Sequence, residues 1–171
     1  MRAGSSMKPK GCECTTFIWV ILPGPLPVWW ADRLSPYNDE MFELTVESVF
    51  SAAHAIVVQG VMEQVHGHDW HVTACLQGEK LDKDGLLVDF HAVERALNQI
   101  VAPFRNANLN ETAPFDRVNP SAENVAVHIG SRLATDLEPI FRGAEGQATK
   151  VRVAWVRVTE APGCAITYRL D

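Results

Sequence analysis

The chain contains Ser51-Ala-Ala-His54 and, further on, His66-Gly67-His68-Asp69-Trp70, and these two stretches decide its fold. The second stretch enters a run of alternating apolar residues, Trp70, Val72, Ala74 and Leu76. Such alternation is typical of a β-strand, in which residues two apart project from one face. The imidazoles of His66 and His68 therefore share a face. Because two strand residues span only about 6.6 Å, both rings can converge on one metal ion.

The residues before His54 predict the partner strand. Over Met41–Ala53, polar residues alternate with Phe42, Leu44, Val46, Ser48 and Phe50. If the two strands pair antiparallel, His54 supplies a third ligand beside His66 and His68. Three protein ligands leave one coordination position open, which is the arrangement of catalytic zinc sites. The His-x-His spacing alone also suits surface or hydrogen-bonded histidines, and the third histidine favours the metal.

Length and composition indicate one domain that does not bind nucleic acid. The 171 residues are enough to bury a sizeable core. The formal net charge is −6 and the lysines and arginines form no cluster, so nucleic acid is not an expected partner. The four cysteines do not form the dense framework of a small secreted protein. We therefore expect the protein in the cytoplasm.

The first forty residues do not match the rest of the chain. A short apolar run, Phe17–Leu22, is followed at once by three prolines. A membrane-spanning helix needs about twenty apolar residues, so we expect no membrane span. A signal peptide is the alternative, but no small-residue cleavage site of the A-x-A kind follows the run. We predict that residues 1–40 are an N-terminal extension outside the core and that residues 41–171 form the functional domain.

From Met41 onward the pattern predicts the element order β-β-α-α-β-β. The expected strands are Met41–Ala53, His68–Gly78, Thr149–Thr159 and Ala165–Leu170, and the expected loops are Ala55–Val65 and Phe104–Pro120. One helix is expected between its N-cap Asp89 and Pro103, and a second after its N-cap Ser121. This is an α+β fold, a four-stranded antiparallel sheet with two helices on one face. Its open edges predict association between subunits.

Six motifs follow one another through this domain. They are Phe50-Ser-Ala-Ala-His54, His66-Gly-His68, Gly85-Leu-Leu-Val-Asp89-Phe90, Asn108-Leu109, Asn119-Pro-Ser-Ala-Glu123-Asn124 and Thr159-Glu160. The ordered series resembles the 6-pyruvoyl-tetrahydropterin synthase and 6-carboxy-tetrahydropterin synthase family. The resemblance implies a tunnelling fold, in which subunits join edge to edge into a barrel of three. It also implies that two barrels stack as a hexamer, a dimer of trimers, with active sites between subunits.

The resemblance also implies roles for individual residues. It implies that His54, His66 and His68 hold zinc and that Glu160 anchors a pterin substrate. A carboxylate can accept a bidentate pair of hydrogen bonds from an aminopyrimidinone edge. Without the family, Glu160 would be interpreted as a solvated turn residue. Ser121 lies in a matching motif, and we expect it to contact the substrate.

The sequence departs from the family pattern at its usual catalytic triad. The cysteine expected a few residues ahead of His-Gly-His falls on Met62, which cannot take a proton. Arg105-Asn106 stand where an Asp-His pair is expected. Glu63 lies three residues before His66, and the resemblance extends to a subset of the family in which a glutamate at this spacing replaces the cysteine. A carboxylate near zinc, but not bound to it, is a suitable general base.

Members of that subset cleave the side chain of 7,8-dihydroneopterin to give 6-hydroxymethyl-7,8-dihydropterin. The resemblance therefore implies a zinc-dependent lyase acting on the side chain of 7,8-dihydroneopterin or its triphosphate, with Glu63 as base. The replaced triad leaves a second hypothesis, a non-catalytic or altered-substrate pterin-binding homologue that retains zinc and the pterin anchor. A cyclohydrolase-like enzyme on the related fold is a weaker third hypothesis, because its expected cysteine ligands are not evident.

Overall fold

Two long antiparallel strands form the centre of the structure, a computed structural model that describes residues 41–142 and 150–171. Strand β1 (Phe42–His54) pairs with strand β4 (His66–Gly78) from Phe42 opposite Gly78 to His54 opposite His66. Burial alternates along β1 as the sequence predicts, with every second residue from Leu44 to His54 buried. Strand β4 begins two residues before its predicted start, so both His66 and His68 belong to it.

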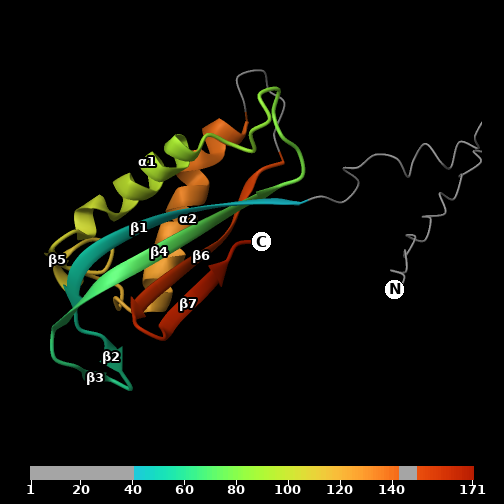
Figure 1. The fold of residues 1–171 in the computed structure, drawn as a ribbon. Helices are drawn as coiled ribbons and strands as arrows, with labels where there is room; N and C mark the ends of the chain where they lie inside the picture. Colours follow the sequence, from blue (N-terminus) through green and yellow to red (C-terminus); the bar gives the residue numbers. More distant parts are fainter. Residues whose placement is uncertain (1–40, 143–149) are drawn as a thin grey trace, which may run out of the picture. The chain divides into compact units, whose positions relative to one another are not determined.

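The sheet contains one more strand than predicted and is mixed rather than purely antiparallel. Its order is β5-β1-β4-β6-β7, with β6 at Arg152–Ala161 and β7 at Cys164–Arg169 (Figure 1). The added strand β5 (Ala107–Asn108) lies parallel to β1, inside the predicted loop Phe104–Pro120. Two residues are too few to produce an alternating pattern, so the sequence could not predict it. The predicted strand start at Thr149 lies outside the described residues.

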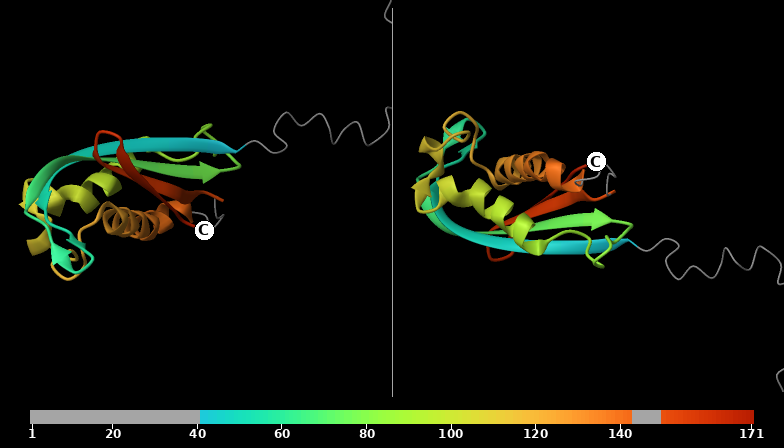
Figure 2. Two further views of the ribbon diagram at one scale, coloured as in Figure 1. Left: turned by 90° about the horizontal axis from the view of Figure 1, so that it is seen from below. Right: turned by 90° about the horizontal axis from the view of Figure 1, so that it is seen from above.

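Two helices cover one face of the sheet, as predicted (Figure 2). Helix α1 (Phe90–Val101) begins at its predicted N-cap, where the Asp89 carboxylate accepts from the amide of His91 at 2.9 Å. Helix α2 (Ala122–Phe141) begins at Ser121, whose hydroxyl accepts from the amide of Asn124 at 3.4 Å. Short 3-10 turns lie at Ala102–Phe104 and Leu109–Glu111. The helices bury apolar stripes against Trp70, Phe50 and the inward residues of the strands.

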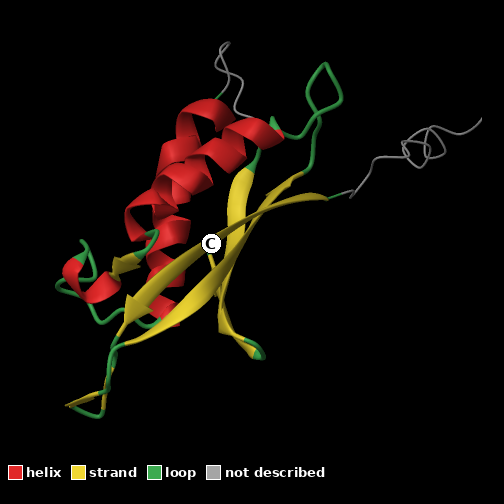
Figure 3. Ribbon diagram, turned by 60° about the vertical axis from the view of Figure 1, so that its left-hand side comes forward, coloured by secondary structure: helices red, strands yellow, loops and turns green. Residues whose placement is uncertain are grey.

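The predicted loop Ala55–Val65 contains a small hairpin. Strands β2 (Val57–Val58) and β3 (Val61–Met62) pair antiparallel, and the hairpin projects from the ends of β1 and β4 (Figure 3). Its two turn residues, Gln59 and Gly60, both have positive φ, 51° and 80°. Two consecutive positive φ values match the right-handed twist of a two-residue hairpin turn. The hairpin therefore extends the main β1–β4 pair beyond the sheet.

Within the described part of the chain, no helix is long and apolar enough to cross a membrane. Residues 1–40 lie outside the described residues. Their interpretation as an extension, with the functional domain at 41–171, stays a prediction.

Helix α2 carries a half-buried histidine that links stability to pH. Burial, and then the charge of Arg132, hold the pKa of His128 below its ordinary value. Its ring packs against Phe104 and Phe115. In the unfolded chain His128 has an ordinary pKa of about 6.5, so it binds a proton more readily there than in the folded chain. His128 thus contributes stability that is present above the unfolded pKa and is lost as the pH falls towards the folded pKa.

We expect the free energy of unfolding to fall less between neutral and mildly acidic pH in a His128→Gln variant than in the unaltered protein. Urea unfolding at several pH values measures this. Taking the difference between the two proteins cancels the contribution of every other titrating group. Parallel pH dependence in the two proteins would contradict the assignment to His128.

Candidate metal centre and adjoining cavities

The β1–β4 register brings the three predicted histidines together. His54 ends β1 directly opposite His66, and His68 follows on the same face of β4. The ring centroids lie 4.8 Å apart for His54 and His66, 5.4 Å for His54 and His68, and 4.8 Å for His66 and His68. The structure therefore places all three imidazoles at one end of the sheet, as the sequence predicts.

His54 is held in one orientation by the backbone before α2. Its side chain is fully buried, and Nδ1 lies 2.8 Å from the carbonyl oxygen of Pro120. Because a carbonyl can only accept, Nδ1 carries the hydrogen and Nε2 presents a lone pair. His66 is arranged in the same way, since its Nδ1 donates to the carbonyl oxygen of Gln64 at 2.9 Å. Such outer contacts fix the tautomer that a metal-binding histidine needs.

The lone pair of His54 faces another acceptor. Its Nε2 lies 2.8 Å from Oε1 of Glu160, and Nε2 of His68 lies 3.5 Å from the same oxygen. Neither of these buried nitrogens has a hydrogen-bond partner among the described residues. Two facing lone pairs repel each other, and an unsatisfied buried nitrogen is costly. A cation among these atoms removes both problems.

The donor set fits a tetrahedral metal ion. The candidate ligand atoms of His54, His66, His68 and Glu160 all lie within 4.8 Å of one another. Bonds of about 2.0–2.1 Å at tetrahedral angles place ligand atoms about 3.3 Å apart, close to the distances from Glu160 to the two Nε2 atoms. Imidazole nitrogens with one carboxylate are a donor set that zinc accepts.

Glu160 reaches the histidines because β6 is irregular there. Thr159 pairs with Ala165 and Ala161 pairs with Cys164, so Glu160 has no partner residue on β7. A bulge of this kind redirects a side chain next to a site. The sequence predicts a pterin anchor at Glu160, and the structure adds that its carboxylate lies against the histidine cluster.

Two asparagines clamp the hairpin stem next to the histidines. Asn110 exchanges hydrogen bonds with the backbone of Ala55, receiving from its amide and donating to its carbonyl, both at 2.8 Å. Asn119 does the same with Val57, at 2.9 and 3.2 Å. A side-chain amide offers one donor and one acceptor edge, as a peptide does. The sequence predicts a loop at Phe104–Pro120, but no local pattern indicates this clamp.

The clamp positions Glu63 at the base of the hairpin. Its backbone amide donates to the carbonyl of Ile56 at 3.1 Å, and its Oε1 accepts from the amide of Ile56 at 3.1 Å. The same oxygen lies 3.7 Å from Nδ1 of His66. Glu63 therefore stands beside the cluster without belonging to the candidate ligand set. The neighbouring Met62 is exposed and offers no acid or base.

The pair Arg105-Asn106 has structural contacts instead of free acid-base groups. The Arg105 guanidinium donates to the carbonyl of Val49 and to Oδ1 of Asn98, both at 2.9 Å. Asn106 adopts a positive φ of 55°, and its amide donates to the carbonyl of Ser51 at 2.6 Å. Both residues thus fasten the loop to the free edge of β1.

Ser121 and Cys75 do not belong to the candidate ligand set. The Ser121 hydroxyl caps α2 by accepting from the amide of Asn124. The preceding residue, Pro120, contacts His54 through its carbonyl oxygen. Its predicted contact with a substrate stays a prediction. Burial, and then the charge of Glu43, raise the pKa of the Cys75 thiol. A buried thiol of raised pKa is inert, so Cys75 does not replace the expected cysteine.

Two cavities adjoin the cluster. One, of about 700 Å³, is lined by His68, Glu160 and residues on the face of the sheet that the helices leave open. The other, of about 510 Å³, lies towards β5 and is lined by Asn106 and Asn108, among others. Gly67, His68 and Asp69 line both. A small molecule at the cluster would therefore have room on either side of this part of β4.

The sheet order, the two helices on one face and the histidine cluster at the strand ends define an α+β protein of the tunnelling-fold class. The 6-pyruvoyl tetrahydropterin synthase family model matches residues 43–171. The chain belongs to this family.

Individual relatives agree with the assignment. The 6-carboxy-5,6,7,8-tetrahydropterin synthase of Bacillus subtilis is 31% identical over 140 residues, covering 78% of this chain and 87% of that protein. The structure of Caenorhabditis elegans 6-pyruvoyl tetrahydropterin synthase superposes with a TM-score of 0.62 at 18% identity, covering 77% of this chain and 97% of that one. A catalytic-residue mutant of Plasmodium vivax 6-pyruvoyltetrahydropterin synthase gives 0.59 at 20% identity, covering 78% and 99%. The two structures support the fold.

The geometry predicts that the three histidines hold one metal ion together. We expect His54→Ala to purify with little bound metal, because this substitution removes the one ligand that is fully buried and oriented by Pro120. Elemental analysis of the purified protein measures metal per chain. His71→Ala is the matched control, since His71 lies on the same strand, three residues beyond His68, and outside the candidate ligand set. Equal metal content in both variants would contradict the assignment.

Proposed function

We propose that this protein is a zinc-dependent lyase acting on the side chain of 7,8-dihydroneopterin or its triphosphate, and that it releases 6-hydroxymethyl-7,8-dihydropterin. The observation that carries the proposal is the meeting of His54, His66 and His68 with the Glu160 carboxylate at one end of the sheet. A zinc ion bound there would act as a Lewis acid on the side-chain hydroxyls of the pterin. Family membership supplies the pterin as substrate class.

Glu63 is the proposed general base. Proton transfer needs a carboxylate within reach of the reacting hydroxyl but free of the metal. Glu63 lies outside the candidate ligand set but beside it, with its Oε1 3.7 Å from Nδ1 of His66, and the Ile56 amide holds it in place. The Plasmodium vivax relative is described as a catalytic-residue mutant in which a glutamate is replaced by alanine. A glutamate acts as a catalytic residue in that protein, which supports the same residue type here.

Glu160 is the proposed pterin anchor. A carboxylate has two acceptor oxygens, which match the two donors on the aminopyrimidinone edge of a pterin. Glu160 lies beside the cluster and lines the larger cavity, so a pterin bound to it would place its side chain near the histidines. Ser121 is proposed as an additional substrate contact.

The second candidate is a pterin-binding homologue without this reaction, or with a changed substrate. The observation that favours it is that Arg105 and Asn106 donate hydrogen bonds to backbone carbonyls of β1. The family pattern has acid-base residues at these two positions. Conversion of dihydroneopterin by the purified protein separates the two candidates. Tight pterin binding without any product would favour the second.

We also propose that the chain works as a homo-oligomer, a hexamer made of two trimers. Strand β7 has no neighbour beyond it in the described sheet, and β5 covers only two residues of β1. Free edges of this length are normally covered, and edge pairing between copies would cover both. The cytoplasm stays the expected location.

Glu63→Gln provides the test of the base. The amide keeps the acceptor oxygen for the Ile56 amide but cannot take a proton, so we expect turnover of 7,8-dihydroneopterin to fall at least about a hundredfold. Zinc content should stay the same, because Glu63 is not a candidate ligand. Glu94→Gln, an exposed change on α1, is the control. Undiminished turnover in Glu63→Gln would remove Glu63 from the mechanism.

Glu160→Gln distinguishes a pterin anchor from a fourth metal ligand. As an anchor, Glu160 is required for pterin binding, so we expect KM to rise at least about tenfold while zinc content is retained. Steady-state kinetics and elemental analysis on the same preparation measure both. Loss of zinc with unchanged KM would assign Glu160 to the metal instead.

A further inference from the structure

The hairpin stem, Ala55–Val57, is held by two side chains that imitate a strand. Asn110 accepts from the amide of Ala55 and donates to its carbonyl, and Asn119 does the same with Val57. In an extended backbone, residues two apart direct their amide and carbonyl groups to one side. The two asparagines therefore occupy the place of a neighbouring strand, with one side-chain amide for each paired residue of the stem.

Glu63 occupies the other side of the stem. Its amide donates to the carbonyl of Ile56 at 3.1 Å, and its Oε1 accepts from the amide of Ile56 at 3.1 Å. The carboxylate thus takes the place of a peptide carbonyl opposite Ile56. Its contacts with Ile56 and His66 both use Oε1, which leaves Oε2 to take a proton. The position of the proposed base therefore depends on the position of the stem.

Little else in the described chain holds the hairpin. The four residues of β2 and β3 are between 42 and 70% exposed. A two-stranded hairpin without further packing is only marginally stable in water. Its connection to the rest of the chain therefore depends on the four hydrogen bonds that the stem makes with Asn110 and Asn119.

Both asparagines are themselves fixed by the fold. Asn110 lies in a 3-10 turn that begins at the fully buried Leu109. Asn119 directly precedes Pro120, whose carbonyl oxygen lies 2.8 Å from Nδ1 of His54. The clamp therefore fixes the proposed base relative to the buried metal ligand.

We propose that Asn110 and Asn119 are positioning residues for proton transfer, and that they act on turnover by holding Glu63 at a fixed place relative to His54. The inference rests on the proposed function and adds two residues to it. Rates that depend on a positioned group are sensitive to its placement, since a shift of about 1 Å can cost a hundredfold.

The two pairs of the clamp can be removed separately, by Asn119→Ala and by Asn110→Ala. We expect each substitution to lower kcat for 7,8-dihydroneopterin at least about tenfold and to change KM less than about twofold. Zinc content should stay the same, because neither asparagine belongs to the candidate ligand set. Steady-state kinetics and elemental analysis on the same preparation measure all three quantities. An unchanged kcat in both variants would overturn the proposal.

Combination with Glu63→Gln shows whether the asparagines act through the base. In that background we expect Asn119→Ala to change kcat less than about twofold, because the group that Asn119 positions no longer accepts a proton. A loss as large as in the otherwise unaltered protein would mean that the substitution disturbs the whole site. That outcome would overturn the positioning role.

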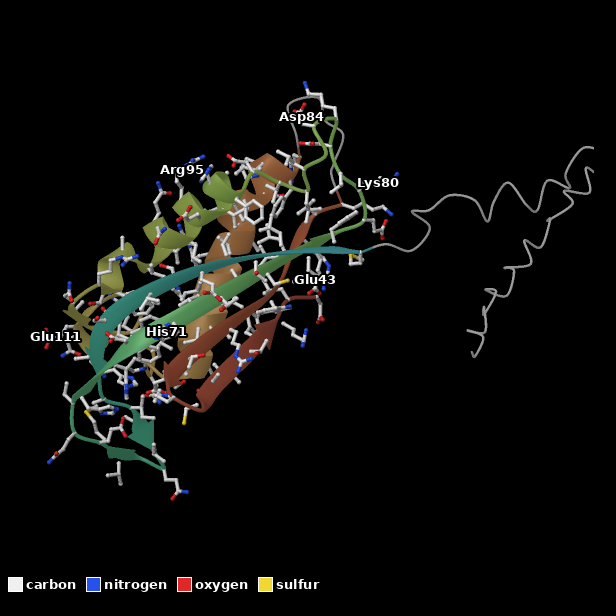
Figure 4. All side chains as sticks on the ribbon, viewed as in Figure 1. Glu43, His71, Lys80, Asp84, Arg95 and Glu111 are labelled. Atoms are coloured by element: carbon white, nitrogen blue, oxygen red, sulfur yellow. The ribbon has the colours of Figure 1, made fainter. Side chains whose placement is uncertain are left out.

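Glu111→Ala is the matched control for the loop. Oε1 of Glu111 accepts from Nδ2 of Asn108 at 3.0 Å, so this substitution also removes a side-chain hydrogen bond from the turn that carries Asn110. Glu111 is exposed and lies away from the hairpin (Figure 4). We expect its replacement to leave kcat unchanged. A fall equal to that in Asn110→Ala would overturn the role of the asparagines.

Hydrogen exchange of single amides tests the positioning without turnover. The informative amides are those of Ile56 and Glu63, since neither of them bonds to an asparagine. In the zinc-loaded, full-length protein we expect both to exchange at least about tenfold faster in Asn119→Ala. Unchanged exchange would mean that other contacts hold the hairpin, for example with a second copy of the chain, and would overturn the proposal.

Absence of turnover in the unaltered protein contradicts the proposed function alone. The exchange rates of the Ile56 and Glu63 amides then still decide whether the asparagines hold the glutamate. The two proposals can therefore fail independently.

Discussion

The antiparallel register of β1 and β4 is the constraint on which the site depends. It places His54 opposite His66 and leaves His68 two residues further along the same face. The side-chain period of a strand is two, so a slip of one residue would turn His54 towards the opposite face and expose the buried row from Leu44 to Phe50. The apolar row that stabilises the fold therefore also fixes the position of the ligands.

A second constraint is electrostatic. The described structure gathers lone pairs where a folded protein would normally pair a donor with each acceptor. Nε2 of His54, Nε2 of His68 and the Glu160 carboxylate converge, and neither nitrogen has a hydrogen-bond partner among the described residues. The backbone carbonyls of Pro120 and Gln64 enforce this by taking the other ring hydrogens of His54 and His66. These two hydrogen bonds therefore prepare the cluster to bind a positive charge.

Much of this arrangement follows from local sequence patterns. Alternation over β1 and β4 and the caps Asp89 and Ser121 predict the main elements to within a few residues, because these patterns depend on neighbours in sequence. Strand β5 and the hairpin strands β2 and β3 could not be predicted, because two residues are too few to show an alternating pattern.

The fine geometry of the site depends on distant backbone atoms. The bulge that brings Glu160 to the histidines and the Pro120 carbonyl that orients His54 leave no side-chain pattern to detect. The same limit applies to the asparagine clamp. An asparagine in a loop is compatible with many partners, and only the tertiary fold shows that Asn110 and Asn119 pair with the hairpin stem.

The segment before α2 links these parts to one another. The Asn119 side chain accepts from the backbone of Val57 in the hairpin, and the next residue, Pro120, accepts from the ring of His54 through its carbonyl. Asn124, in the first turn of α2, donates to the Asn119 carbonyl. The hairpin that carries Glu63 and the ring of His54 therefore share one mechanical support. For protein engineering, the hairpin and the buried histidine therefore form a single module. A transplanted hairpin would keep its alignment only if the start of α2 travelled with it.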